Sequence, residues 1–219
     1  MQHTFSKTAG MLAVSALFAL SSQAMAQTTT DTDHSHDHSH DEQAEELYLI
    51  DEADVRARDL SDWAGDWQSV YPYLMDGTLD AVMEHKADHG DQTAEEYRAY
   101  YEIGYKTDVE RIVIDGEDVT FFRNGEPTRG QYEADGYEIL TYESGHQGIR
   151  FIFEKAGGDD AAPQFIQFSD HEMVPTQVDH YHLYWGEDRA ALLEDVTNWP
   201  TYYASGLSGD ELVAKMIAH

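Results

Sequence analysis

The second half of the chain is divided into short stretches of alternating polar and apolar residues, most of them ended by a turn signal. Such stretches fit half-buried β-strands, because side chains along a strand point alternately to its two faces. The predicted strands cover residues 109–114, 118–123, 129–134, 137–143, 149–155, 164–170 and 180–185. The turn signals are Asp115-Gly116, Asn124-Gly125, Asp135-Gly136, Ser144-Gly145 and Gly157-Gly158. Consecutive strands joined by tight turns pair antiparallel, so this pattern predicts one continuous meander.

A further strand is predicted around Trp67 and ends at Pro72. A sheet with this many strands tends to close on itself, because closure removes the unpaired edges. Helices are predicted at residues 77–89, from the capping box that Thr93 opens to about Tyr105, at 188–196, and from the capping box at Ser208 to about Ala218. We therefore expect a mainly β fold with added α, namely an antiparallel β-barrel with peripheral helices.

The first 26 residues have the features of a cleaved secretory signal peptide. A positive charge precedes a short apolar run at residues 11–20, and Ala24-Met25-Ala26 fits the small-residue cleavage pattern. The apolar run is too short for a typical membrane span. Residues 27–43 contain no apolar residue and predict a disordered tail rich in His and Asp. The folded domain is then expected over residues 44–219 of an exported, periplasmic protein.

The composition limits the possible partners and the possible metal ligands. The formal net charge of −30 argues against nucleic acid and anionic membrane surfaces as partners. The chain contains no cysteine, so disulfides cannot stabilise the fold even in an oxidising compartment. Any metal site in the protein must therefore use nitrogen and oxygen ligands.

Three histidines near one predicted hairpin indicate a metal site. His180 and His182 are two residues apart, so both rings lie on the same face of a strand. An antiparallel hairpin that turns near Pro175 and Thr176 brings His171 opposite one of them, on that same face. Three neutral imidazoles with an open fourth position suit Zn²⁺. We expect this face to be the barrel interior, where rigid strands would hold the site.

Several alternatives to this interpretation stay open. The three rings could instead be hydrogen-bonded polar residues at the mouth of a barrel, with no metal. The fourth ligand is not visible in the sequence: water, a histidine of the tail and a nearby carboxylate are all candidates. The candidate carboxylates are Asp170, Glu172 and Asp179, and the remaining histidines His85, His89, His146 and His219 are expected to be isolated surface residues. His85 and His89 have helical i, i+4 spacing, which by itself is a weak metal signal.

The tail carries a second, different group of histidines. His34, His36, His38 and His40 alternate with Ser and Asp residues. Exposed imidazoles on a flexible segment form a low-affinity, low-specificity ligand for Zn²⁺, Cu²⁺ or Ni²⁺. We expect this run to act as an auxiliary metal-binding segment.

Motifs distributed along the domain resemble the ZinT (YodA) family of periplasmic zinc-binding proteins. These motifs are Leu60-Ser61-Asp62-Trp63, Trp67-Gln68-Ser69-Val70-Tyr71-Pro72, Tyr105-Lys106-Thr107-Asp108, Gln167-Phe168-Ser169-Asp170-His171, His180-Tyr181-His182 and Asn198-Trp199-Pro200-Thr201-Tyr202-Tyr203. The resemblance implies a lipocalin-like barrel and zinc bound by His171, His180 and His182. It also implies zinc recruitment together with the periplasmic binding component of a zinc ABC importer, and binding of Cd(II) and other divalent metals.

Two other functions remain possible from the sequence. Three histidines plus water are also the ligand set of carbonic anhydrase, so a zinc-dependent hydrolase or hydratase is the alternative. No nucleophile or phosphate-binding motif is present, so any catalysis would have to come from the metal. Barrels also carry apolar ligands, but imidazoles and acids on the expected lining argue against that role. We expect a zinc-binding protein that is not an enzyme.

Overall fold

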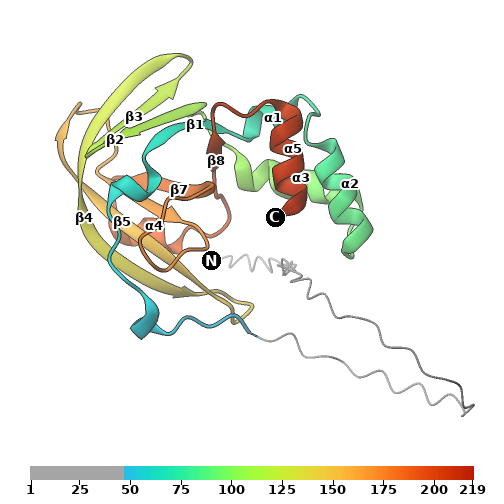
Figure 1. Ribbon diagram of the computed structural model, residues 1–219, viewed down its shortest axis with the longest axis horizontal. Coiled ribbons are helices and arrows are strands. Elements are labelled where there is room, and N and C mark those ends of the chain that lie inside the picture. The colour runs from blue at the N-terminus through green and yellow to red at the C-terminus, as the bar shows by residue number, and fades with distance from the viewer. Residues whose placement is uncertain (1–46) are drawn as a thin grey trace, which may run out of the picture.

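The computed structural model describes residues 47–219, and its centre is a closed antiparallel barrel of eight strands (Figure 1). The strands pair in chain order, and β1 closes the barrel by pairing with both β2 and β8. They are β1 Gly65–Ser69, β2 Arg111–Asp115, β3 Asp118–Arg123, β4 Glu126–Thr141, β5 Gln147–Gly158, β6 Phe165–Ser169, β7 His180–Gly186 and β8 Thr201–Ala204. The predicted fold class is confirmed. The expected signal peptide and His/Asp-rich tail lie outside the described residues.

The longest strand, β4, joins two of the predicted strands, so the prediction of a turn at Asp135-Gly136 was wrong. The pairing register with β5 shifts between Ala134 and Tyr137, which is a β-bulge within a continuous strand. Gly136 has φ 84°, a backbone conformation that serves a bulge as well as a turn. The dipeptide is therefore compatible with both structures, and only the pairing of β5 with β4 on both sides of it distinguishes them.

Two short elements differ from the sequence expectation. The strand around Trp67 ends at Ser69, and Tyr71–Met75 forms helix α1, with Pro72 in its first turn. Proline is tolerated there because the first N–H groups of a helix have no partner within the helix. Strand β8 was not predicted, since four residues are too few to display a clear alternation.

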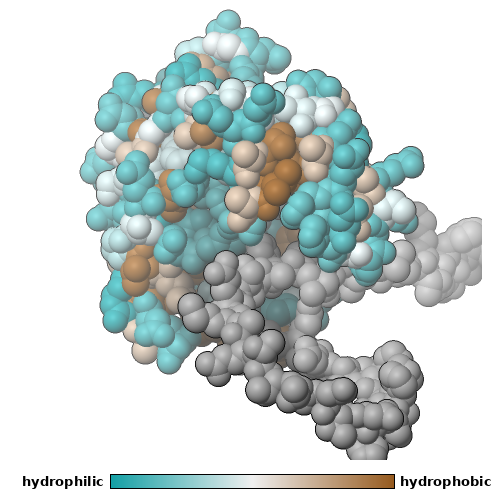
Figure 2. All heavy atoms as spheres, turned by 45° about the vertical axis from the view of Figure 1, so that its right-hand side comes forward, coloured by the Kyte–Doolittle hydropathy of each residue, from teal (hydrophilic) through white to brown (hydrophobic). Residues whose placement is uncertain are grey.

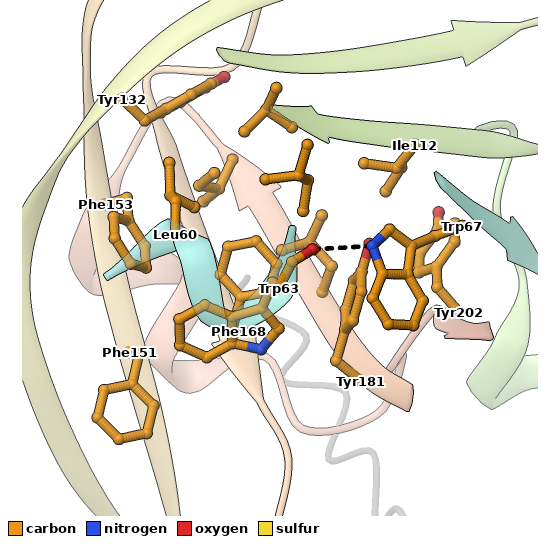
Figure 3. Close-up of a cluster of buried hydrophobic side chains, with 14 of the residues drawn as sticks. Leu60, Trp63, Trp67, Ile112, Tyr132, Phe151, Phe153, Phe168, Tyr181 and Tyr202 are labelled. Carbon is orange, nitrogen blue, oxygen red and sulfur yellow. Dashed lines mark hydrogen bonds between the residues drawn. The ribbon is translucent and has the colours of Figure 1, made fainter. Parts of the chain in front are cut away.

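Aromatic side chains fill the barrel interior (Figure 3). Trp63 comes from a 3-10 helix at Leu60–Trp63, is fully buried, and stacks on Phe168 with ring centroids 4.5 Å apart. The indole Nε1 of Trp67 donates a hydrogen bond of 2.8 Å to the carbonyl oxygen of Trp63. The segment before β1 is thereby fixed inside the barrel, and its position matters for the site described below.

The remaining helices pack against one outer wall of the barrel (Figure 1). These are α2 Asp80–His89, α3 Ala94–Tyr105 and α5 Gly209–Ala218, whereas α4 Arg189–Glu194 follows β7. Both predicted capping boxes are present, at Thr93 before α3 and at Ser208 before α5. The helices form a second apolar cluster that includes Tyr203 of β8. The barrel wall at β8 is thus buried on both faces.

The surface is mostly polar, as the net charge of −30 requires (Figure 2). The face in Figure 2 is mostly hydrophilic, with one apolar patch to the upper right and smaller apolar spots elsewhere. Within residues 47–219, no helix combines the length and the apolar character needed to span a bilayer.

The first prediction concerns the barrel core. Phe121 on β3 is fully buried in the interior, whereas the next residue, Phe122, points outward and is partly exposed. Truncation of a buried Phe leaves a cavity, so Phe121→Ala should lower the free energy of unfolding by about 3–5 kcal/mol. Phe122→Ala should cost about 1 kcal/mol or less. Urea unfolding followed by fluorescence measures both, and equal losses would contradict the assigned strand orientation.

Candidate metal centre

The pairing of β7 with its two neighbours determines where the central histidines lie. Ser169 of β6 is opposite His182, which matches one of the two registers expected for the hairpin. On the other side, β8 places Tyr203 opposite His180 and Thr201 opposite His182. Because β7 is paired along both edges, the backbone positions of its two histidines are firmly defined.

The two histidines of β7 face the outside of the barrel, so the expectation of an interior site was wrong. Tyr181 and Leu183, which alternate with them, belong to the aromatic interior. The ring of His180 instead stacks on Tyr203, 4.9 Å between centroids, and Tyr203 belongs to the helical cluster. Period-two alternation separates the two faces but cannot say which is inside. Here large aromatic side chains occupy the interior, and the helices cover the outer face.

A third and a fourth histidine approach this wall from different elements. His171 lies in the loop after β6, and its ring centroid is 5.5 Å from that of His180. His219 follows the last turn of α5, with ring centroids 4.8 Å from His171 and 4.5 Å from His180. Ligand atoms of these three residues all lie within 4.8 Å of one another. The structure therefore brings His219 into the cluster, contrary to the expectation of an isolated surface residue.

His182 lies beside this group and is oriented by a neighbouring hydroxyl. Its ring centroid is 6.1 Å from that of His180, and its Nδ1 is 2.8 Å from the Oγ1 of Thr201. The Thr201 hydroxyl donates its only proton to the carbonyl oxygen of Trp199, at 2.9 Å. Oγ1 must then accept from Nδ1–H, which leaves the Nε2 of His182 with its lone pair free for a metal.

Burial keeps the rings of His180, His182 and His219 in the neutral form, which is the form that binds metals. Desolvation, with smaller contributions from His219 and His171, lowers the pKa of His180 to about 3. Burial also lowers the pKa of His182 well below its usual value, and burial together with the electrostatic influence of the neighbouring His171 lowers the pKa of His219. No proton therefore has to be displaced from these rings at neutral pH before a metal binds.

One nitrogen–nitrogen distance in the cluster is close to the separation expected for two zinc ligands. The Nε2 atoms of His171 and His219 are 3.1 Å apart. Two ligands of a tetrahedral Zn²⁺ with metal–nitrogen distances of ~2.0–2.1 Å are separated by about 3.3 Å. Neutral imidazole nitrogens also bind Zn²⁺ in preference to hard cations such as Mg²⁺ and Ca²⁺, which prefer oxygen ligands.

The other candidate ligands have different positions. The Asp170 carboxylate accepts hydrogen bonds from Arg58 and Trp63, and its side chain is 2 % exposed, so it is already engaged away from the histidines. Asp179 lies 3.5 Å from the Nζ of Lys215. His85 and His89 lie beside each other on α2, with their tilted rings 4.3 Å apart between centroids. Among residues 47–219, the cluster around His180 is the only group of three or more potential ligands at metal-binding distance.

The remaining sequence candidates add nothing to this group. His146 accepts a hydrogen bond from the backbone N–H of Tyr48, far from the cluster in sequence and on a different hairpin. The tail histidines His34, His36, His38 and His40 lie outside the described residues. Of the four histidines, sequence reasoning missed His219. The capping box at Ser208 marked where α5 begins, but it gave no information on where the helix ends or what its end approaches.

The closed barrel, the lateral helices and the group of histidines on the outer wall define a lipocalin-like metal-binding protein. A family model described as ZinT (YodA) periplasmic lipocalin-like zinc-recruitment matches residues 40–219. The chain therefore belongs to the ZinT family.

Known relatives agree with this assignment. The chain is 56% identical over 182 residues to the probable metal-binding protein YrpE of Bacillus subtilis. The match covers 82% of this chain and 72% of YrpE. It is 50% identical over 171 residues to the zinc-binding protein AdcA of Streptococcus pyogenes. That match covers 76% of this chain and 33% of AdcA. The chain thus spans about a third of AdcA. These relatives are named for metal binding and not for catalysis.

A solved structure has the same fold. The crystal structure of the Zn(II)-bound ZinT-like domain of Streptococcus pneumoniae AdcA matches with a TM-score of 0.74 and 43% sequence identity. The match covers 77% of this chain and 94% of that domain. The lipocalin-like fold expected from the sequence is confirmed.

The second prediction concerns the pH dependence of the metal-free protein. An unfolded His has a pKa of ~6.5, whereas folding lowers that of His180 to about 3, so the unfolded state binds more protons between these values. Stability contributed by this residue is present above pH ~6.5 and is lost as the pH falls toward 3. Urea unfolding in chelator at pH 7.5 and pH 5 should show the loss, and His180→Gln should reduce it. The same pH dependence in both proteins would contradict the burial of His180.

The third prediction concerns the residue that orients His182. Thr201→Val removes the hydroxyl while preserving shape, so His182 loses the acceptor for its Nδ1–H. Loss of such a partner typically lowers metal affinity ~10–100-fold. Competition with a chromophoric chelator measures the change for Zn²⁺. Thr120→Val on β3, at the far side of the barrel, is the matched control and should bind zinc like the unmodified protein.

Proposed function

We propose that this protein binds Zn(II) through His171, His180 and His182, with His219 as the fourth ligand. The supporting observation is the convergence of imidazoles from a loop, a strand and the end of a helix onto one point of the barrel wall. The Zn(II)-bound state of the related AdcA domain supports the choice of metal. Imidazole also accommodates other divalent ions, so Cd(II) is proposed as a further cargo.

A fourth histidine favours binding over catalysis. Catalytic zinc sites keep one coordination position open for water or substrate, whereas sites with four protein ligands are closed. His219 would occupy the position that a hydrolase or a carbonic-anhydrase-like enzyme needs for its metal-bound water. The proposed role is therefore the capture and delivery of zinc, and the sequence alternative of a zinc enzyme is disfavoured.

The biological setting is proposed from the family and from the sequence. The family description places its members in the periplasm, and residues 1–26 have the pattern of a cleaved signal peptide. Capture by His34, His36, His38 and His40 in the tail would precede transfer to the barrel site. AdcA, a zinc-binding protein, contains a domain of this kind within a longer chain. We propose that the present protein passes zinc to the periplasmic binding component of a zinc ABC importer.

The fourth prediction tests the ligand set. His180→Ala and His182→Ala should abolish high-affinity zinc binding, because each removes a ligand on the rigid strand. His219→Ala should leave a weaker three-histidine site, because water can take the fourth position. Isothermal titration with Zn²⁺ on protein that lacks the tail separates this site from the tail histidines. Substitution with Co²⁺ should reveal a changed visible spectrum for His219→Ala.

The control for these variants is His89→Ala. His89 is exposed on α2, and its Nδ1 lies 2.7 Å from the carbonyl oxygen of His85 in its own helix. Its removal should leave zinc affinity and stoichiometry unchanged. High-affinity binding that survives His180→Ala would refute the proposed site. A cobalt spectrum unaltered by His219→Ala would reject His219 as the fourth ligand while leaving the other three in place.

A further inference from the structure

Arg58 is a fully buried cation in the segment that precedes the barrel. Its side chain has no exposed surface, and its guanidinium lies 4.1 Å from the ring centroid of Trp63 and 4.9 Å from that of Phe151. A buried charge is tolerated only when it is paired and hydrogen-bonded. The partners of Arg58 therefore indicate which parts of the fold depend on it.

The guanidinium binds the two residues that flank His171. Its Nη1 donates to both carboxylate oxygens of Asp170, at 2.8 and 3.0 Å, and to the carbonyl oxygen of Glu172, at 3.1 Å. The Asp170 carboxylate also accepts hydrogen bonds from the Nε1 of Trp63 and the backbone N–H of Glu172. Both neighbours of His171 are thus held by a single side chain, Asp170 through its carboxylate and Glu172 through its backbone carbonyl.

The same segment holds the rest of the β6–β7 loop. Arg58 Nη2 donates to the carbonyl oxygen of Thr176, and Arg58 Nε donates to Asp62 at 2.7 Å. Asp62 in turn accepts from the backbone N–H groups of Thr176 and Val178, through its carboxylate and its carbonyl oxygen. The loop that connects His171 to His180 is therefore anchored along its length to residues 58–62.

His171 needs such an anchor more than the other histidines do. His180 and His182 lie in β7, which is hydrogen-bonded to strands on both sides. His219 continues the helix α5, which packs in the second apolar cluster. His171 lies beyond the last residue of β6, outside the ladder, so strand pairing does not determine its position.

We propose that Arg58 is a positioning residue of the zinc site. It holds Asp170 and Glu172 so that the intervening His171 faces His180 and His219, without touching the metal itself. Arginine is required because its planar fork donates to Asp62, Asp170 and the loop carbonyls at the same time, which a lysine ammonium cannot do. This inference rests on the proposed zinc site and adds to it the residue that assembles the loop ligand.

The test is a double-mutant cycle between Arg58 and His171. Arg58→Met should lower zinc affinity about 10–100-fold, in the range found for groups that orient metal ligands. In a His171→Ala background, Arg58→Met should cause little further loss, because the ligand that Arg58 positions is already absent. Arg58→Lys should fall between Arg58→Met and the unmodified protein. Zinc affinity is measured by chelator competition on tail-free protein, and Co²⁺ spectra report the coordination.

The control separates positioning from general destabilisation. Phe121→Ala weakens the core on β3, which lies four strands from β7 in either direction around the barrel, and should lower stability without lowering zinc affinity. An Arg58→Met effect of equal size with and without His171 would overturn the inference. If Arg58→Met fails to fold, Asp170→Asn replaces it in the same cycle, with the same two outcomes. Loss of zinc binding in His180→Ala, measured alongside, tests the proposed site independently of Arg58.

Discussion

The antiparallel pairing of β7 with β8 is the interaction on which the site depends. It places Tyr203 opposite His180 and Thr201 opposite His182, so one short strand supplies both the aromatic surface under the first ring and the hydroxyl that orients the second. The same short strand also pairs with β1 and so closes the barrel. Barrel closure and the orientation of two metal ligands are therefore consequences of one pairing.

The sequence predicted the relative placement of the hairpin histidines but not their surroundings. Side-chain alternation and hairpin spacing are local, and they led to a register in which Ser169 is opposite His182. Which face is interior depends on the total volume of side chains on each side. Tyr181 and Leu183 point into the barrel, and helices from other parts of the chain bury the outer face of the wall as well. The two faces of β7 therefore differ less in polarity than those of a strand with one face in water.

The features that the sequence did not reveal are those set by long-range packing. The capping box at Ser208 correctly predicted where α5 begins, but the docking of α5 on the barrel wall brings His219 to the cluster. Likewise Asp135-Gly136 predicted a turn, but β5 pairs with β4 on both sides of this dipeptide, so Gly136 with its positive φ lies in a bulge. The hydrogen bonds of Arg58 span more than a hundred residues to Asp170, and no local pattern indicates such a contact.

The ligands of the proposed site come from three parts of the fold. A loop contributes His171, the barrel wall contributes His180 with His182 beside it, and the helical cluster contributes His219. A metal that binds only when all three parts are in place raises the free energy of unfolding. The increase grows with the ratio of the free metal concentration to the dissociation constant of the metal. Protonation of the rings opposes this stabilisation, because a charged imidazole cannot ligate. Zinc bound at neutral pH would thus add a direct link between the helices and the barrel to the apolar contacts and the few polar contacts that already join them.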